Sequence, residues 1–315
     1  MRLLHFKSAE QMGLIRRLQQ IFVSVTLGSE TFPMGRLWSH SRKGRQSGSF
    51  EYDENWLKHP ERFALEPVLK FTQGTFHTQT DQVLFGAIGD SAPDRWGRVL
   101  MRRAESQRAR STNETPRTLT EIDCLLGVND EARGGALRFS ETVNGPYLSP
   151  KDKLSIPPLI DLPKLFSAAQ RFMDESDTTE DLKLLLAPGS SLGGARPKAS
   201  IRDLDGELAI AKFSRKDDEF NIIAWEAVAL TLAQQAGLHV PKWRMAIIEN
   251  KPLLIIKRFD RENGTRIPFL SAMSMLGAKD NQQRSYLEIA YSLLLYGGLQ
   301  TLICWNFGAE LFSAF

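Results

Sequence analysis

In the first part of the chain, hydrophobic and polar residues alternate in short runs, as they do in strands that bury one face. Such runs occupy residues 21–27 and 32–38, and a third resumes at residues 50–52. The polar, glycine- and serine-rich residues 39–49 predict a hairpin loop between the last two. A further strand is expected at residues 137–139. The pattern predicts a β-rich N-terminal subdomain.

Other segments follow a helical period of three to four residues. One helix is expected to begin near Pro93, with Asp90 or Ser91 as its cap. Its four arginines would bind an acidic partner or, as the plainer alternative, form a solvated face. Further helices are predicted at residues 119–128, 159–173 and 220–236.

Four prolines between residues 141 and 160 mark the best candidate for a linker. The mixture of strands and helices predicts an α+β protein that is divided at this linker. The expected parts are an N-terminal subdomain at residues 1–145, a proline-rich linker at 146–160, a second core at 161–265 and a last segment at 266–315.

Composition adds few constraints. The 315 residues are enough for two domains, and the net charge of +3 permits nucleic-acid contact without arguing for it. Cys124 and Cys304 supply neither a disulfide framework nor a zinc site, so we expect a cytoplasmic location. The N-terminus lacks an unbroken apolar run, and we expect no secretory signal.

The candidate chemistry lies between residues 184 and 221. An apolar run meets a glycine- and serine-rich turn, and a strand-like run further on delivers Lys212. Gly193 and Gly194 let the backbone approach an anion, and the exposed N–H groups of such a turn form an anion-binding nest. Lys212 would add a point charge for the phosphates of ATP, as in kinase-like folds. A hairpin with an ordinary surface lysine fits the same residues.

Two known phosphate loops are excluded, and two other segments support a kinase-like site. From Gly189 the spacing of a Walker A loop reaches Gly194, but Ala195 and Arg196 stand where that loop requires Lys and Ser or Thr, and the pattern GxGxxG is absent. Glu226 lies inside the helix expected at residues 220–236, where a kinase-like fold places the glutamate that pairs with the strand lysine. A surface acid is the alternative. Residues 252–259 predict a buried strand that would serve as an adenine hinge.

These segments resemble the HipA family of bacterial kinase toxins. The matching stretches are GSSLGGARPKA at 189–199, AIAKF at 209–213, WEAVALTLAQQAGLHVP at 225–241 and KRFDR at 257–261. In the N-terminal half, the matches are DSAPDRWGRVLMRR at 90–103 and LLGVNDEARGGALRF at 125–139. Together they cover most of residues 20–265 in family order.

The resemblance implies a serine/threonine protein kinase toxin of a toxin–antitoxin system, which uses ATP and Mg²⁺. Its fold would have a β-rich N-terminal subdomain and a helical C-terminal lobe. The implied partner is a helix-turn-helix antitoxin of the HipB type, and DNA would be contacted only through that antitoxin. The protein substrate is not implied by these residues, although the family's substrates include an aminoacyl-tRNA synthetase.

Residue by residue, Lys212 matches the family's phosphate-binding lysine and Glu226 matches its helix glutamate. Ser191 matches the autophosphorylated loop serine, and a phosphate there would place about −2 charge where ATP's own phosphates sit. We therefore expect phosphorylation of Ser191 to inhibit. The ATP loop and the adenine hinge supply the other implied nucleotide-binding residues, which are Ser190, Ser191, Leu192, Gly193, Gly194, Ala195, Lys198, Lys257, Arg258 and Phe259.

The resemblance ends near residue 296. The family's catalytic loop and metal-binding aspartate should follow the hinge, but Asp280 is the last aspartate and no histidine follows His239. Asp260 is the nearest carboxylate, yet it sits at the end of the hinge strand. We therefore expect a two-lobed fold whose helical C-terminal lobe, at residues 266–315, is partial and truncated. We also expect no catalytic or metal-binding residue and no kinase activity. A non-catalytic module that binds an antitoxin or a nucleotide is the alternative.

Other classes fit less well. Residues 289–309 carry no charge and are long enough to raise a membrane helix, but their glycines and polar residues argue against one. A small-molecule kinase of the aminoglycoside phosphotransferase type would need the same downstream catalytic cluster. A regulator that binds DNA directly would need a helix-turn-helix, which the sequence does not show.

Overall fold

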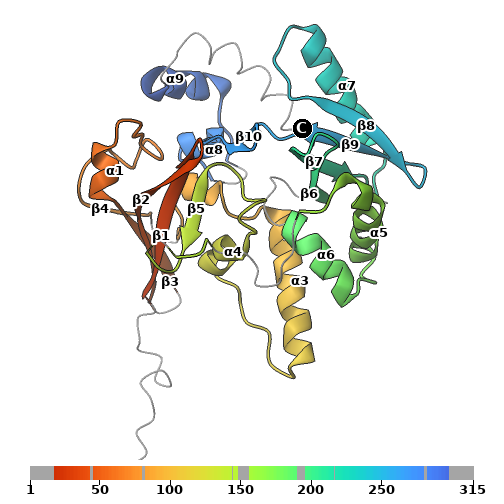
Figure 1. Cartoon of the computed structure of the whole chain (residues 1–315), viewed down its shortest axis with the longest axis horizontal. Coiled ribbons are helices and arrows are strands. Elements are labelled where there is room, and N and C mark those ends of the chain that lie inside the picture. The colour runs from red at the N-terminus through yellow and green to blue at the C-terminus, as the bar shows by residue number, and fades with distance from the viewer. Residues whose placement is uncertain are drawn as a thin grey trace, which may run out of the picture.

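The structure, a computed structural model, describes residues 18–42, 45–79, 82–143, 145–147, 156–189, 196–215, 217–279 and 282–297. Two antiparallel sheets lie at the centres of its two halves, with helices packed around them (Figure 1). The predicted α+β class is confirmed. Of the expected linker, residues 148–155 lie outside the described ranges.

The N-terminal sheet has five strands in the order β4-β3-β2-β1-β5. Alternate residues of its strands are buried, such as Ile21, Val23 and Val25, because successive side chains point to opposite faces. The strands are β1 (Leu18–Leu27), β2 (Glu30–Arg42), β3 (Arg45–Tyr52), β4 (Thr75–His77) and β5 (Leu137–Ser140).

Strands β2 and β3 form the expected hairpin, but the prediction that residues 39–49 form its loop is wrong. Strands β2 and β3 stay paired as far as Arg42 and Arg45, well beyond the apolar core. The ladder is made by backbone hydrogen bonds, which do not require hydrophobic side chains. His40 and Ser49 add a side-chain hydrogen bond of 2.8 Å across the two strands.

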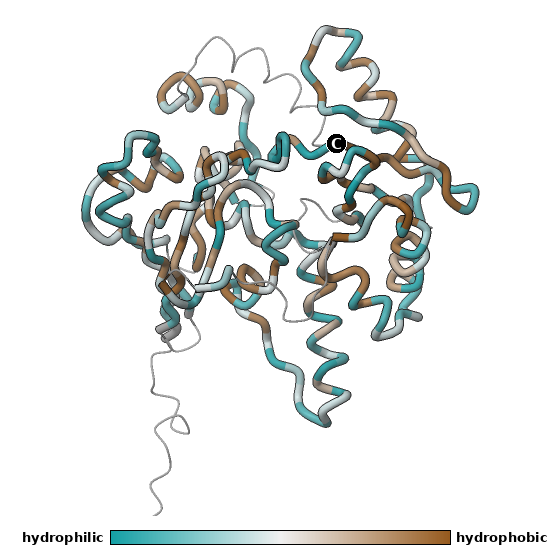
Figure 2. The backbone as a smooth tube through the Cα atoms, in the orientation of Figure 1, coloured by the Kyte–Doolittle hydropathy of each residue, from teal (hydrophilic) through white to brown (hydrophobic). Residues whose placement is uncertain are grey.

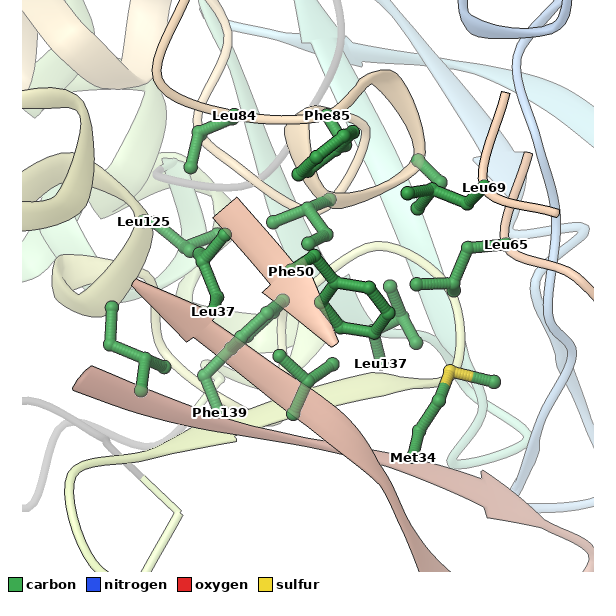
Figure 3. Packing of buried hydrophobic residues seen from close by; sticks show 14 of the residues in the cluster. Met34, Leu37, Phe50, Leu65, Leu69, Leu84, Phe85, Leu125, Leu137 and Phe139 are labelled. Carbon is green, nitrogen blue, oxygen red and sulfur yellow. The ribbon is translucent and has the colours of Figure 1, made fainter. Parts of the chain in front are cut away.

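The core of the N-terminal half is centred on Phe50 (Figure 3). Met34, Leu37, Leu137 and Phe139 from β2 and β5 pack around it, and each is at most 7% exposed. Short helices close the cluster, namely α1 (Glu54–Lys58), α2 (Gly86–Gly89) and α4 (Glu121–Gly127).

The second sheet has four strands in the order β6-β7-β9-β8, and its inner strands are covered on both faces. Leu253 and Ile255 of β9 join the cluster under α5 and α6, whereas Leu254 between them packs against α7. Burial on both sides explains the continuous apolar run along β9. The elements are α5 (Leu162–Met173), α6 (Thr179–Gly189), β6 (Lys198–Arg202), β7 (Leu208–Phe213), α7 (Ile222–Gln235), β8 (Trp243–Ile248) and β9 (Lys251–Lys257).

The apolar run before the glycine-rich turn belongs to helix α6. Asp181 hydrogen-bonds with Thr178 at the start of this helix, and Leu182 and Leu185 lie one turn apart in the core of the second half. The helices and strands expected at residues 119–128, 159–173, 220–236 and 252–259 are confirmed within a few residues at each end. Figure 2 shows hydrophobic residues along the central strands of the second sheet.

Helix α3 (Arg95–Ser111) joins the two halves. Its cap is Asp94, whose Oδ1 accepts the N–H of Gly97 at 2.7 Å, so the prediction of Asp90 or Ser91 as the cap is wrong. Trp96 and Leu100 belong to the core of the second half, and α3 packs beside α6 (Figure 1). The predicted boundary at residue 145 stays a prediction, but α3 packs with the later segment.

Short elements follow β9 and include the helix expected near residues 285–295. None of the residues of this helix is buried, and Ser285 and Glu288 form a capping box at its start. No helix in the ranges that the structure describes is both long and apolar enough to cross a membrane. The remaining elements are the 3₁₀ turn η2 (Leu159–Asp161), β10 (Arg261–Glu262), β11 (Thr265–Arg266), α8 (Ala272–Met275) and α9 (Tyr286–Tyr296).

A buried carboxylate, Glu66, is expected to make the stability of the fold depend on pH. Its Oε2 accepts the N–H of Ala87 at 2.6 Å, but burial dominates and raises the pKa of Glu66 from 4.5 to about 7. The folded chain then binds more protons than the unfolded chain between these values, so stability falls as pH rises through that window.

Replacing Glu66 by glutamine should keep the acceptor without the charge. At pH 8 we expect this variant to be more stable than the wild type by up to about 3 kcal/mol, and at pH 5 the two should differ little. Urea unfolding at both pH values measures the difference. Equal pH dependence in the two proteins would show that Glu66 does not carry it.

Candidate functional site

Lys212 lies on the central strand β7 and faces helix α7. The alternation of β7 sends Ala209, Ala211 and Phe213 into the core under α5 and α6, so Lys212 points to the other side. There its Nζ forms an ion pair with Oε1 of Glu226. The lysine side chain is 23% exposed and the glutamate only 7%. The predicted pairing of Lys212 with Glu226 is thus present in the structure, and the role of the pair towards ATP stays a prediction.

Lys198 begins strand β6 and lies directly opposite Lys212 in the β6–β7 register. Its Nζ is 2.9 Å from Oδ2 of Asp94, and both side chains are buried. Burial lowers the pKa of Lys198 and raises that of Asp94, and the attraction between the two charges opposes both shifts. The predicted phosphate contact of Lys198 stays a prediction, but its ammonium is engaged by Asp94.

Most of the predicted ATP loop lies outside the described residues. This holds for Ser190, Ser191, Leu192, Gly193, Gly194 and Ala195. Gly189 before the loop and Arg196 after it are the described residues on either side. The guanidinium of Arg196 makes a two-pronged contact with Asp218, at 2.9 and 2.8 Å, which links the far end of the segment to the residues that precede α7. The roles of these loop residues stay predictions.

The predicted adenine hinge follows β9. Lys257 donates its N–H to the carbonyl of Lys242, and its Nζ lies 3.4 Å from Asp205. Arg258 turns its guanidinium inward, whereas Phe259 is 58% exposed and packs edge-on against Phe269. Among these three residues, Phe259 therefore offers the apolar surface that an adenine could contact.

A buried cluster around Asp260 links the hinge to the N-terminal half. Arg258 donates to both carboxylate oxygens of Asp260, at 2.7 and 2.5 Å, and Arg261 donates to one of them at 2.9 Å. The N–H of Gly135 also donates to Asp260, at 2.7 Å. Burial raises the pKa of Asp260, but the hydrogen bond and charge of Arg258 and the charge of Arg261 win, so the pKa lies below its usual value.

The guanidinium groups of this cluster also reach backbone carbonyls of the N-terminal half. Arg258 donates to the carbonyls of Ala132 and Arg133, at 2.6 and 3.2 Å, and Arg261 donates to Arg133 at 2.7 Å. Sequence reasoning missed this junction. The alternating charges of KRFDR were a signal, but their partners lie about 125 residues earlier in the chain.

The described residues fit the two implied cofactor groups differently. Lys212, held by a buried acid and still partly exposed, suits the phosphates of a nucleotide. Among the residues in the described ranges, no group of three or more His, Cys, Asp or Glu could hold a metal ion.

Comparisons with known proteins point to one family. The model of the HipA N-terminal domain matches residues 25–121, and that of the HipA-like C-terminal domain matches residues 190–301. No curated protein matches the chain. Among solved structures, the complex of HipA, HipB and operator DNA from Shewanella oneidensis MR-1 gives a TM-score of 0.49 at 17% identity. That match covers 87% of this chain and 60% of the other.

Proposed function

Because the chain belongs to the HipA family, we propose that its second half binds ATP on the sheet β6-β7-β9-β8, as part of a kinase-like protein. The observation that carries this proposal is the ion pair between Lys212 and Glu226. A lysine fixed by a helix glutamate is the arrangement with which protein kinases hold the α- and β-phosphates. Glu226 is the more deeply buried partner and holds the ammonium in place, while the lysine side chain stays partly exposed.

The proposal extends to the class of the reaction and to its partner. The family relation supports a cytoplasmic serine/threonine protein kinase toxin that transfers phosphate from ATP to a protein hydroxyl. A HipB-type helix-turn-helix antitoxin would bind the chain, and operator DNA would be contacted through that antitoxin. Phosphorylation of Ser191 would inhibit, because its charge would compete with the phosphates of ATP.

A second candidate, nucleotide or antitoxin binding without phosphoryl transfer, is favoured by the state of Asp260. This carboxylate is the nearest to the hinge, and both of its oxygens are engaged by Arg258, with Arg261 and Gly135 as further donors. It is therefore held as a structural anion and is unsuited to accept a proton from a substrate hydroxyl.

Melting the purified chain with and without ATP tests the proposal. A ligand that binds only the folded state at a hundredfold its dissociation constant stabilises that state by about 2.7 kcal/mol. We therefore expect ATP with Mg²⁺ to raise the melting temperature by several degrees, and adenosine to raise it less. A chain whose melting is unaffected by millimolar ATP would contradict the proposal.

Radiolabelled ATP separates the two candidates. Label on Ser191 or on an added protein would establish phosphoryl transfer. A melting shift without label would favour the binding module. A Ser191→Asp variant that binds ATP as well as the wild type would contradict the inhibitory role of that serine.

A further inference from the structure

The first two turns of α3 contact both flanks of the glycine-rich segment. On the far side, the indole Nε1 of Trp96 donates to the carbonyl of Lys198 at 3.1 Å. On the near side, Gly189 packs so closely that an added Cβ would lie 2.7 Å from Leu100 Cδ1 and 3.2 Å from the same Nε1. Trp96 therefore lies between the residue that precedes the segment and the strand that follows it.

Asp94 adds a charged contact to the same turn. One oxygen caps α3 through the N–H of Gly97 at 2.7 Å, and the other is 2.9 Å from Nζ of Lys198. The lysine side chain is 4% exposed and the aspartate 8%. Water screens such a buried pair little, so each charge depends on the other.

The charges of the two strands are arranged in two separate pairs. Lys198 and Lys212 face each other across β6 and β7, a placement that is unfavourable for like charges. Each lysine has its own acid from a different element, Asp94 of α3 for the first and Glu226 of α7 for the second. Without Asp94, the buried charge of Lys198 would compete for Glu226 and disturb the Lys212 pair.

We propose that Asp94 and Trp96 are positioning residues for nucleotide binding, which hold Gly189 and Lys198 at a fixed separation and keep Lys198 away from Glu226. That a nucleotide binds here rests on the proposed function, whereas the contacts of Asp94 and Trp96 do not depend on it. The N-terminal half would thus set the geometry of the phosphate site through a helix that touches no nucleotide.

Asparagine at position 94 tests the charge alone, because asparagine is also a good helix cap. We expect Asp94→Asn to weaken binding of ATP at least tenfold and to leave binding of adenosine, which has no phosphates, unchanged. Lys198→Met should weaken ATP binding as well. The double variant should be no weaker than either single variant, because it leaves no buried charge without a partner.

The opposite result is equally informative. If Asp94→Asn binds ATP as tightly as the wild type or more tightly, Lys198 is a phosphate ligand that Asp94 restrains, and the inference is overturned. A loss of ATP and adenosine binding together would show general destabilisation in place of positioning, which also contradicts it.

Amide hydrogen exchange without nucleotide decides the structural part even if the wild type binds no ATP. Asp94→Asn and Trp96→Phe should each make amide exchange faster in the peptides that contain Gly189 and Lys198. The matched controls are Asp53→Asn, another helix cap, and Trp56→Phe, whose buried indole donates to Phe63 at 3.3 Å. The controls should leave these peptides unchanged, and unchanged exchange in the Asp94 variant would refute the inference.

Discussion

Replacing Asp260 by asparagine is expected to destabilise the chain by about 3–5 kcal/mol, the usual cost of removing one partner of a buried ion pair. Asp260 is the shared anion of two buried guanidiniums, those of Arg258 and Arg261. Asparagine has nearly the same shape but no charge, so both cations would stay buried without this carboxylate. Urea unfolding at pH 7 gives the difference in free energy.

A surface pair supplies the control for this measurement. Asp205 also faces a cation, Lys257, at 3.4 Å, but its side chain is 57% exposed. The change Asp205→Asn should leave the unfolding midpoint unaltered within error, because exposed pairs contribute little. If Asp260→Asn proves as mild as this control, the cluster is hydrated and does not hold the halves together.

The same substitution tests how the halves cooperate. Asp260 accepts the N–H of Gly135, which sits at a positive φ of 71° on the turn before β5. The ring of Phe269 lies close to this glycine, so a Cβ at position 135 would meet it at 3.1 Å. We expect Asp260→Asn to make unfolding of the two sheets separable, because the charged link between them would be weakened.

Local patterns predicted most of the elements because each element buries a face with its own period. The strands at residues 21–27 and 252–259 and the helix at 220–236 were visible in this way. The extension of β2 and β3 to Arg42 and Arg45 was not, because a polar ladder leaves no hydrophobic pattern. Backbone pairing beyond the core is decided by the neighbouring strand.

The candidate site was only partly visible from sequence for a related reason. Lys212 and Glu226 are 14 residues apart and belong to adjacent elements of one motif, so the resemblance brought them together. Asp94 and Lys198 are 104 residues apart and come from different halves. From the sequence alone, a charged residue whose partner lies so far along the chain cannot be told from a surface charge.

The proposed contact with the phosphates of ATP depends on Lys212. Replacing it by methionine should weaken ATP binding roughly ten- to a hundredfold, because a hydrogen bond to a charged group contributes about 1.5–3 kcal/mol. Methionine keeps the aliphatic stem against α7 but leaves Glu226 buried without its cation. The double variant Lys212→Met with Glu226→Gln has no such unpaired buried charge, so its folding should be less affected. Titration calorimetry with ATP and with adenosine measures the loss for each variant.

Two comparisons make this result specific to the phosphates. Lys251→Met removes a lysine from the neighbouring strand β9, one whose Nζ lies over the ring of Phe166 in α5, and should bind ATP as the wild type does. Glu226→Gln leaves the ammonium in place but less firmly oriented, so its loss of affinity should be smaller than that of Lys212→Met. If both lysine variants lose the same affinity, the sheet attracts ATP through its overall charge. Equal binding by Lys212→Met and the wild type would place the phosphates elsewhere.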